Sequence, residues 1–93
     1  LFIYNDLMAI GVLRAATDLK VRVPEELAIV SFDNIELAAY TTPQLTTIAQ
    51  PTVQMGETAV SLLLNRIENP ALPRQQHILP TNLVIRGSCG ANK

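Results

Sequence analysis

The first half of the chain alternates between two patterns of apolar residues. Short, uninterrupted apolar runs at Leu1–Tyr4 and Leu27–Phe32 are typical of strands that are covered on both faces. Between them, from Leu7 to Lys20, apolar residues recur with the period of a helix. A strand, a helix and a second strand form a unit with parallel strands and a right-handed crossover in nearly all cases. The pattern therefore predicts an α/β fold.

The second half of the chain continues the same alternation. The β-branched run Leu45–Ala49 predicts a third strand, and Pro51 opens a second helix at the one position where proline is well tolerated. His77–Leu79 and Leu83–Ile85 are two short strand pieces, separated by a bend at a proline. From Gly87 onward we expect a loose tail.

The first predicted helix is apolar on more than one face. Leu7, Ile10 and Leu13 form a second stripe, which either completes the core or meets another protein molecule. Gly11 costs this helix about 1 kcal/mol relative to alanine, which suggests that another backbone passes close to it.

Composition strengthens the expectation of contact with other protein. The chain has 93 residues, which fits one small domain, and 48% of them are hydrophobic while only 16% are charged. Ordinary domains carry about 25% charged residues. The chain also begins inside an apolar run without an initiator methionine. We interpret it as a piece of a larger protein, some of whose apolar faces meet other protein.

Charge and hydropathy argue against nucleic acid and membrane partners. Seven basic and eight acidic residues give a net charge of −1, and the basic residues are scattered without an aromatic stripe. No apolar run approaches the roughly 20 residues that a membrane span needs. The chain also lacks the basic start and small-residue cleavage site of a signal peptide.

Catalytic and metal chemistry find little support. One cysteine and one histidine allow neither an internal disulfide nor a tetrahedral zinc site. No glycine-rich phosphate loop occurs, so we expect no nucleotide cofactor. His77 and Cys89 could form a catalytic pair, but no third residue is available to orient them. We interpret them as a strand residue and a tail thiol, and predict that the chain is not an enzyme and holds no metal or cofactor.

Polar residues gather where the predicted strands end. Asn5 and Asp6 follow the first strand, Asp33 and Asn34 end the second, and Gln50 ends the third. Ligands of parallel α/β sheets bind beyond the carboxyl ends of the strands. Carboxylates and amides together suit a neutral ligand rich in hydroxyl or N–H groups. Such residues also cap helices and turns for purely local reasons, and that alternative stays open.

The same residues carry a family likeness. The chain resembles the lac repressor/galactose repressor (LacI/GalR) family of transcriptional regulators along nearly its whole length. The stretches that carry the likeness are Tyr4–Gly11 (YNDLMAIG), Arg22–Asn34 (RVPEELAIVSFDN), Leu45–Pro51 (LTTIAQP), Met55–Ala59 (MGETA) and Leu79–Ser88 (LPTNLVIRGS).

The resemblance implies part of a periplasmic-binding-protein-like (type I) effector domain, in which two α/β subdomains enclose a cleft. By the family pattern, residues 1–49 belong to the C-terminal subdomain, residues 50–79 to the N-terminal subdomain, and residues 80–93 form a return strand and a tail. The family binds DNA through an N-terminal helix-turn-helix, which these 93 residues do not contain.

The resemblance also assigns roles to individual residues. Asp33 matches the aspartate that accepts hydrogen bonds from effector hydroxyls or amines, and Gln50 matches a crossover residue that faces the cleft. Asn5 matches a position that contacts sugar in some members of the family and is not an amide in others. Thr52 stands where relatives often carry an aromatic residue, which puts sugar stacking there in doubt. Ser31 replaces a usual glycine, for which we expect no consequence.

Dimerisation is a second implication of the resemblance. The helix from Leu7 to Leu19 and the loop Ile35–Thr42 match the family's subunit contact, which makes Ile10, Arg14 and Tyr40 interface candidates.

We therefore expect the effector-sensing part of a cytoplasmic, homodimeric regulator, with a sugar or a purine as its effector. The alternative is a sugar-binding protein of a transport system with the same fold.

Overall fold

The computed structural model describes residues 1–91, and these form two compact units. One unit comprises residues 1–50 together with the stretch that begins at Asn82, and the other comprises Pro51–Thr81. Among the described residues, no helix combines the length and the apolar character that crossing a bilayer requires.

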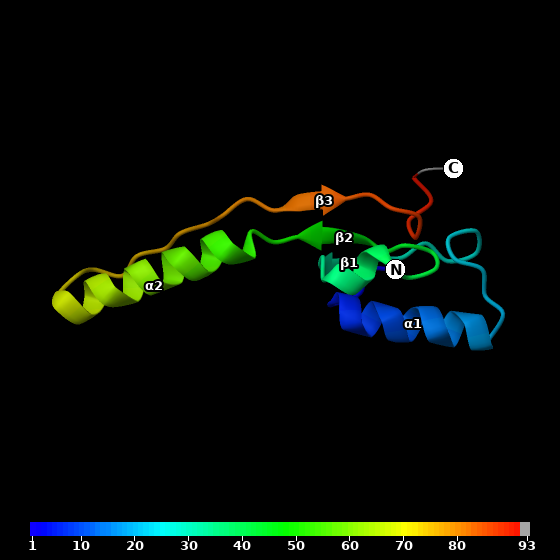
Figure 1. Cartoon of the computed structure of the whole chain (residues 1–93), viewed down its shortest axis with the longest axis horizontal. Helices are drawn as coiled ribbons and strands as arrows, with labels where there is room; N and C mark the ends of the chain where they lie inside the picture. The colour runs from blue at the N-terminus through cyan, green and yellow to red at the C-terminus, as the bar shows by residue number, and fades with distance from the viewer. Residues whose placement is uncertain (92–93) are drawn as a thin grey trace. The chain divides into compact units, whose positions relative to one another are not determined.

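The first unit is built on a three-stranded sheet. Strand β1 (Val30–Asp33) pairs in parallel with β2 (Thr46–Ala49), and β3 (Asn82–Val84) pairs antiparallel on the other side of β2. Figure 1 shows β2 between β1 and β3, with helix α1 (Asp6–Asp18) on the β1 side of the sheet. A 3-10 turn, η1 (Glu36–Ala39), follows β1. The α/β alternation expected from the sequence is present.

The first apolar run forms less strand than its sequence predicts. Only Phe2 bridges to Val30, in the parallel sense, and of Leu1–Tyr4 only Ile3 is buried. In the second run, Ile29 and Ser31 are buried while Val30 and Phe32 are half-buried. The expectation of strands covered on both faces is therefore wrong for this unit. One face of the sheet packs on α1 and η1. On the other face Val30 and Phe32 are half-buried, whereas Thr46 is buried and bonds to Arg86 and Cys89 of the segment after β3.

The core of the first unit is small and lies between the sheet, α1 and η1. The buried apolar side chains that form it are Ile3, Ala9, Leu13, Ile29, Ala38 and Leu45. Ile10 and Val12 of α1 pack against this cluster while remaining partly exposed. The second apolar stripe of α1 is thus divided, because Leu13 belongs to the core whereas Leu7 is exposed.

The segment after Gly87 is part of this core region and not a loose tail. Ser88 is fully buried, and its Oγ donates to the carbonyl oxygen of Ile29 at 2.7 Å. The same Oγ accepts from the backbone nitrogen of Thr46 at 2.9 Å, so this one hydroxyl joins the beginnings of β1 and β2. Small polar residues such as serine are common in loops, which is why the sequence pattern suggested a tail there. Residues 92–93 of that predicted tail lie outside the described residues.

The second unit consists of α2 (Thr52–Glu68) and the extended segment that follows it. Pro51 lies immediately before the helix, one residue earlier than the first helical position expected from the sequence, and its carbonyl oxygen accepts from Met55 N at 2.8 Å. None of the helix residues is buried. The predicted strand His77–Leu79 does not form, because a strand requires a hydrogen-bonded neighbour and no described residue pairs with this segment.

Candidate functional site

The structure brings Asp33 and Gln50 together at the carboxyl end of the parallel strands. Asp33 ends β1 and is in register with Ala49 of β2, so the residue after Ala49 lies beside it. Gln50 Nε2 donates to Asp33 Oδ1 over 2.7 Å. Both side chains are half-buried. A carboxylate and an amide from two different strands thus share one edge of the sheet.

Asn5, the third residue expected here, has a local role. It is the residue before α1, and its Oδ1 accepts from the backbone nitrogen of Met8 at 2.8 Å. This bond satisfies one of the free N–H groups in the first helical turn. Within the described residues, Asn5 makes no side-chain hydrogen bond to Asp33 or Gln50. Its amide N–H groups are the part of the side chain that remains available for a ligand.

The backbone at Asp33 and Asn34 is in a conformation that side chains rarely adopt. The φ angles are +125° at Asp33 and +61° at Asn34. Aspartate and asparagine are among the few residues that tolerate positive φ, yet such conformations still cost about 1–3 kcal/mol each. They persist only where the surrounding structure holds them, and they concentrate at functional sites.

A buried carboxylate, Asp6, holds this turn in place. Asp6 is fully buried, and its Oδ2 accepts from the backbone nitrogen of Ile35, just beyond the turn, at 2.8 Å. Its Oδ1 accepts from the hydroxyls of Ser31 and Thr47, the latter at 2.7 Å. Burying a carboxylate is costly unless it is well hydrogen-bonded, and these three donors provide that compensation. Because Asp6 also begins α1, the carboxylate lies at the positive end of the helix dipole.

The sequence pattern placed Asp6 only among the polar residues at the strand ends and did not reveal that its carboxylate is buried. Ser31 and Thr47 are directly opposite each other in the β1–β2 register, so their hydroxyls lie side by side on one face of the sheet. The signal in the sequence was the presence of hydroxyl residues within short strands, Ser31 in β1 and Thr46 and Thr47 in β2. The expectation that Ser31 has no consequence is wrong, since its hydroxyl donates to Asp6.

Two further contacts secure the turn from the β2 side. Thr47 Oγ1 accepts from the backbone nitrogen of Asn34 at 3.2 Å. Arg86, which follows β3, donates from Nη2 to Asn34 Oδ1 and from Nη1 to the carbonyl oxygen of Leu45, both at 2.9 Å. The turn that presents Asp33 is therefore held by side chains from three separate parts of the first unit.

The three dimer candidates differ in exposure. Ile10 packs partly against the core, whereas Tyr40 is 74% exposed at the end of η1. Arg14 is exposed and pairs with Asp18 one helical turn away at 3.1 Å. Gly11 lies on the exposed side of α1, and a Cβ atom added to it would meet nothing within 4 Å. The backbone that we expected near Gly11 is therefore not found within the described residues.

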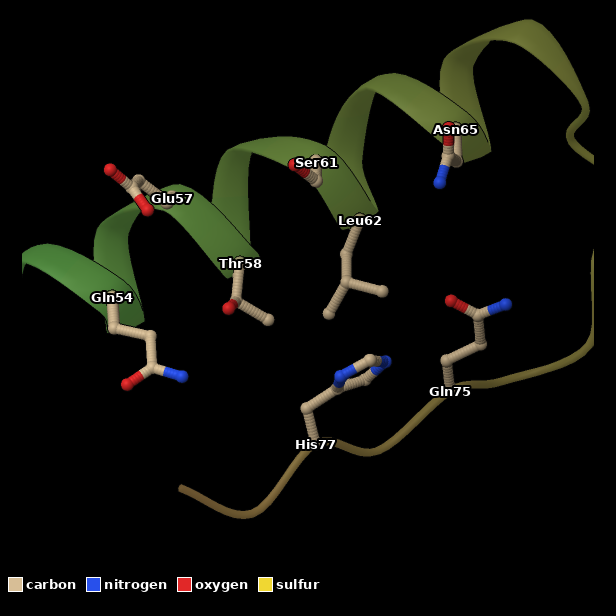
Figure 2. Close-up of a pocket in the computed structure, with 8 residues that line it drawn as sticks. All are labelled: Gln54, Glu57, Thr58, Ser61, Leu62, Asn65, Gln75 and His77. Carbon is tan, nitrogen blue, oxygen red and sulfur yellow. The ribbon is translucent and has the colours of Figure 1, made fainter. Parts of the chain in front are cut away.

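A separate groove lies within the second unit, between α2 and the segment after it. Figure 2 shows Gln54, Thr58 and Leu62 extending from the helix toward Gln75 and His77. The groove measures about 600 Å³ and is open to solvent, and its lining is mostly polar and uncharged. His77 is thus a groove residue and lies beside amide and hydroxyl groups.

Comparison with known proteins gives a consistent picture. Residues 1–89 match the profile of the periplasmic binding protein-like domain family. The ribose operon repressor of Escherichia coli K12 is 44% identical over 87 residues, which are 94% of this chain and 26% of that protein. Among solved structures, a LacI family regulator from Enterococcus faecalis V583 with bound ribose is 40% identical with a TM-score of 0.86, covering 95% of this chain and 33% of its own.

A second solved structure, the complex of the transcriptional regulator CelR with cellobiose, is 34% identical. Its TM-score is 0.87, and the match covers 94% of this chain and 27% of that one. The chain spans about a quarter of the length of the curated relatives it matches. These relatives are transcriptional repressors and regulators. The chain therefore belongs to the periplasmic binding protein-like domain family, and its relatives within that family are LacI-type transcriptional regulators, as the sequence resemblance implied.

Proposed function

We propose that this chain is the effector-sensing and dimerisation part of a LacI-type transcriptional regulator, and that Asp33 and Gln50 bind a small polar effector, namely a sugar. The observation that carries the proposal is the hydrogen-bonded pair of Asp33 and Gln50 at the carboxyl end of β1 and β2. Two similar regulators were crystallised with ribose and with cellobiose, which favours a sugar over a purine.

The chemistry of the pair fits a ligand with several hydroxyl groups. An ionised carboxylate only accepts hydrogen bonds, so Gln50 must turn its NH2 group toward Asp33. This leaves Gln50 Oε1, one Gln50 N–H and Asp33 Oδ2 for a ligand, since no other described residue bonds to them. Two acceptors and one donor match neighbouring sugar hydroxyls, which both donate and accept. An anionic ligand would instead meet the negative charge of Asp33.

The pair also provides the rigidity that a sensor needs. Asp33 is fixed by its strained turn and by Gln50, so an effector finds its acceptor already oriented. In a regulator with two conformations, an effector that binds one of them better shifts the population toward it. Asn5 contributes its amide N–H groups as an additional donor to the same ligand.

Dimerisation would use the exposed side of α1 and η1. Large apolar side chains on these elements are exposed without a covering segment in the described chain, namely Leu7, Met8, Leu19, Leu37 and Tyr40. Together with Arg14, these residues offer an apolar surface with a charged rim, the usual composition of a subunit interface. The proposed partner is a second copy of the same protein, acting in the cytoplasm, where a DNA-bound regulator works.

The decisive experiment is sugar binding by the complete protein, with and without the Asp33 carboxylate. Asp33→Asn keeps the residue type that tolerates positive φ and can still pair with Gln50, so the fold should be unaffected. Because a hydrogen bond to a charged acceptor is lost, affinity for D-ribose or cellobiose should fall by about tenfold or more in calorimetric titration.

The matched control is Asp18→Asn, the same chemical change at an exposed carboxylate of α1. It should leave sugar affinity within about twofold of wild type, as is usual for surface substitutions. Equal affinity in wild type and Asp33→Asn would remove Asp33 from the site, and absence of binding to sugars and purines alike would refute the proposed effector class.

A further inference from the structure

We propose that Asp6 is a positioning residue for effector binding, which acts by holding the Asp33–Asn34 turn through Ile35, Ser31 and Thr47. The inference rests on the proposed effector site at Asp33. It differs from the role that the helix-start position suggests, because the Asp6 carboxylate is turned into the interior of the unit and fully buried.

The hydrogen bonds of Asp6 converge on the strained turn from both sides. Ile35 N, immediately after the turn, donates to Asp6 Oδ2 at 2.8 Å, and Ser31, two residues before Asp33, donates to Oδ1. Thr47 links the two halves of the arrangement. Its hydroxyl donates to Asp6 Oδ1 at 2.7 Å and accepts from Asn34 N at 3.2 Å.

This arrangement explains how two consecutive residues keep positive φ angles. Without the acceptors at Asp6 and Thr47, the backbone N–H groups of Ile35 and Asn34 would lose their partners, and the turn could relax to negative φ. A change of φ at Asp33 swings its side chain away from the position beside Gln50. Sugar affinity should therefore depend on groups that lie beneath the turn and need not touch the sugar.

A purely stabilising role predicts a different result. Ser88 is a suitable control for Thr47. Like Thr47, it is fully buried, and its hydroxyl donates one hydrogen bond and accepts another. Its partners, Ile29 and Thr46, are at the opposite ends of β1 and β2 from the turn. Loss of the Ser88 hydroxyl should lower stability without moving Asp33.

The test uses Thr47 because replacement of Asp6 risks failure to fold. In the complete protein, Thr47→Val removes the hydroxyl at constant shape, and Thr47→Ser retains it. Calorimetric titration with D-ribose and with cellobiose gives the affinity, and the melting temperature without sugar gives the stability. We expect Thr47→Val to weaken binding about tenfold and Thr47→Ser to stay within about threefold of wild type. Ser88→Ala should lower the melting temperature while its affinity remains that of wild type.

The outcomes separate the two proposals. If wild type binds sugar and Thr47→Val binds equally well, the positioning role is refuted while the effector site stands. If Thr47→Val and Ser88→Ala weaken binding in proportion to their loss of stability, Asp6 serves the fold alone. If the wild-type protein binds D-ribose, cellobiose and purines no better than background, the effector site itself is refuted. The positioning role is then refuted with it.

Discussion

Gln50 donates from Nε2 to Asp33 Oδ1 over 2.7 Å, although the two residues are 17 positions apart in the sequence. The bond requires an amide opposite a carboxylate, so Gln50→Glu should replace attraction by repulsion between two negative groups. We expect sugar affinity near neutral pH to fall by about tenfold or more. Acidification, which protonates one carboxyl group of the variant, should restore part of the loss because the shared proton rebuilds the hydrogen bond.

The measurement is a titration of sugar into Gln50→Glu at two pH values, one neutral and one mildly acidic. Gln54→Glu, at an exposed position of α2, is the matched control for the added charge. A Gln50→Glu variant with wild-type affinity at neutral pH would show that the pair does not contact the effector.

Subunit contact should depend on Tyr40 and Arg14 and only indirectly on Ile10. Tyr40→Glu places a charge within the exposed apolar surface, and Arg14→Glu reverses one at its rim. Both should shift the complete protein from dimer toward monomer in analytical ultracentrifugation, since unpaired interface charges cost several kcal/mol. Ile10→Ala should instead lower the melting temperature, because this side chain packs partly against the core. An unchanged sedimentation coefficient for both charged variants would place the interface elsewhere.

The sequence predicted the order of the elements better than their burial. Helical periodicity located α1, and the apolar run before Asp33 located β1 to within a few residues. The period-two alternation of burial in Ile29–Phe32 could not be read from residue types, because a one-sided sheet and a two-sided sheet both use apolar strands. The His77–Leu79 strand failed for a related reason, since local pattern does not reveal whether a neighbouring strand exists.

In the site, too, the sequence predicted the contacts that follow from the order of the strands and missed those that depend on their register. Asp33 and Gln50 could be placed together because parallel strands bring their carboxyl ends to one edge. The role of Asp6 could not be predicted in this way. It depends on Ser31 and Thr47, and the sequence alone does not give the β1–β2 register that sets these two residues opposite each other. Asn5 was predicted at the ligand, and its carbonyl oxygen is occupied by the cap of α1.

Cys89 should be a more reactive thiol than its position near the chain end suggests. The Thr46 hydroxyl donates to its Sγ at 3.1 Å, and this bond is the main cause that lowers the pKa of Cys89. A lowered pKa means more thiolate at a given pH, and the thiolate is the species that reacts with iodoacetamide. Thr46→Val should therefore slow alkylation at neutral pH, whereas Thr46→Ser, which keeps the hydroxyl, should not. Equal rates in wild type and Thr46→Val would show that Thr46 does not set the thiol's pKa.

Ser88→Ala should be strongly destabilising for so small a change. The variant leaves the backbone nitrogen of Thr46 and the carbonyl oxygen of Ile29 without the hydroxyl that joins them. Each buried polar group left unsatisfied costs about 1–3 kcal/mol, so the free energy of unfolding should fall by about that amount or more. Ser61→Ala, at an exposed position of α2, makes the same chemical change and should alter stability by about 0.5 kcal/mol at most. Urea unfolding of both variants in the complete protein measures the difference. Equal stability of the two would mean that the segment after Gly87 contributes little to the fold, and the buried position of Ser88 would then have to be explained without these two hydrogen bonds.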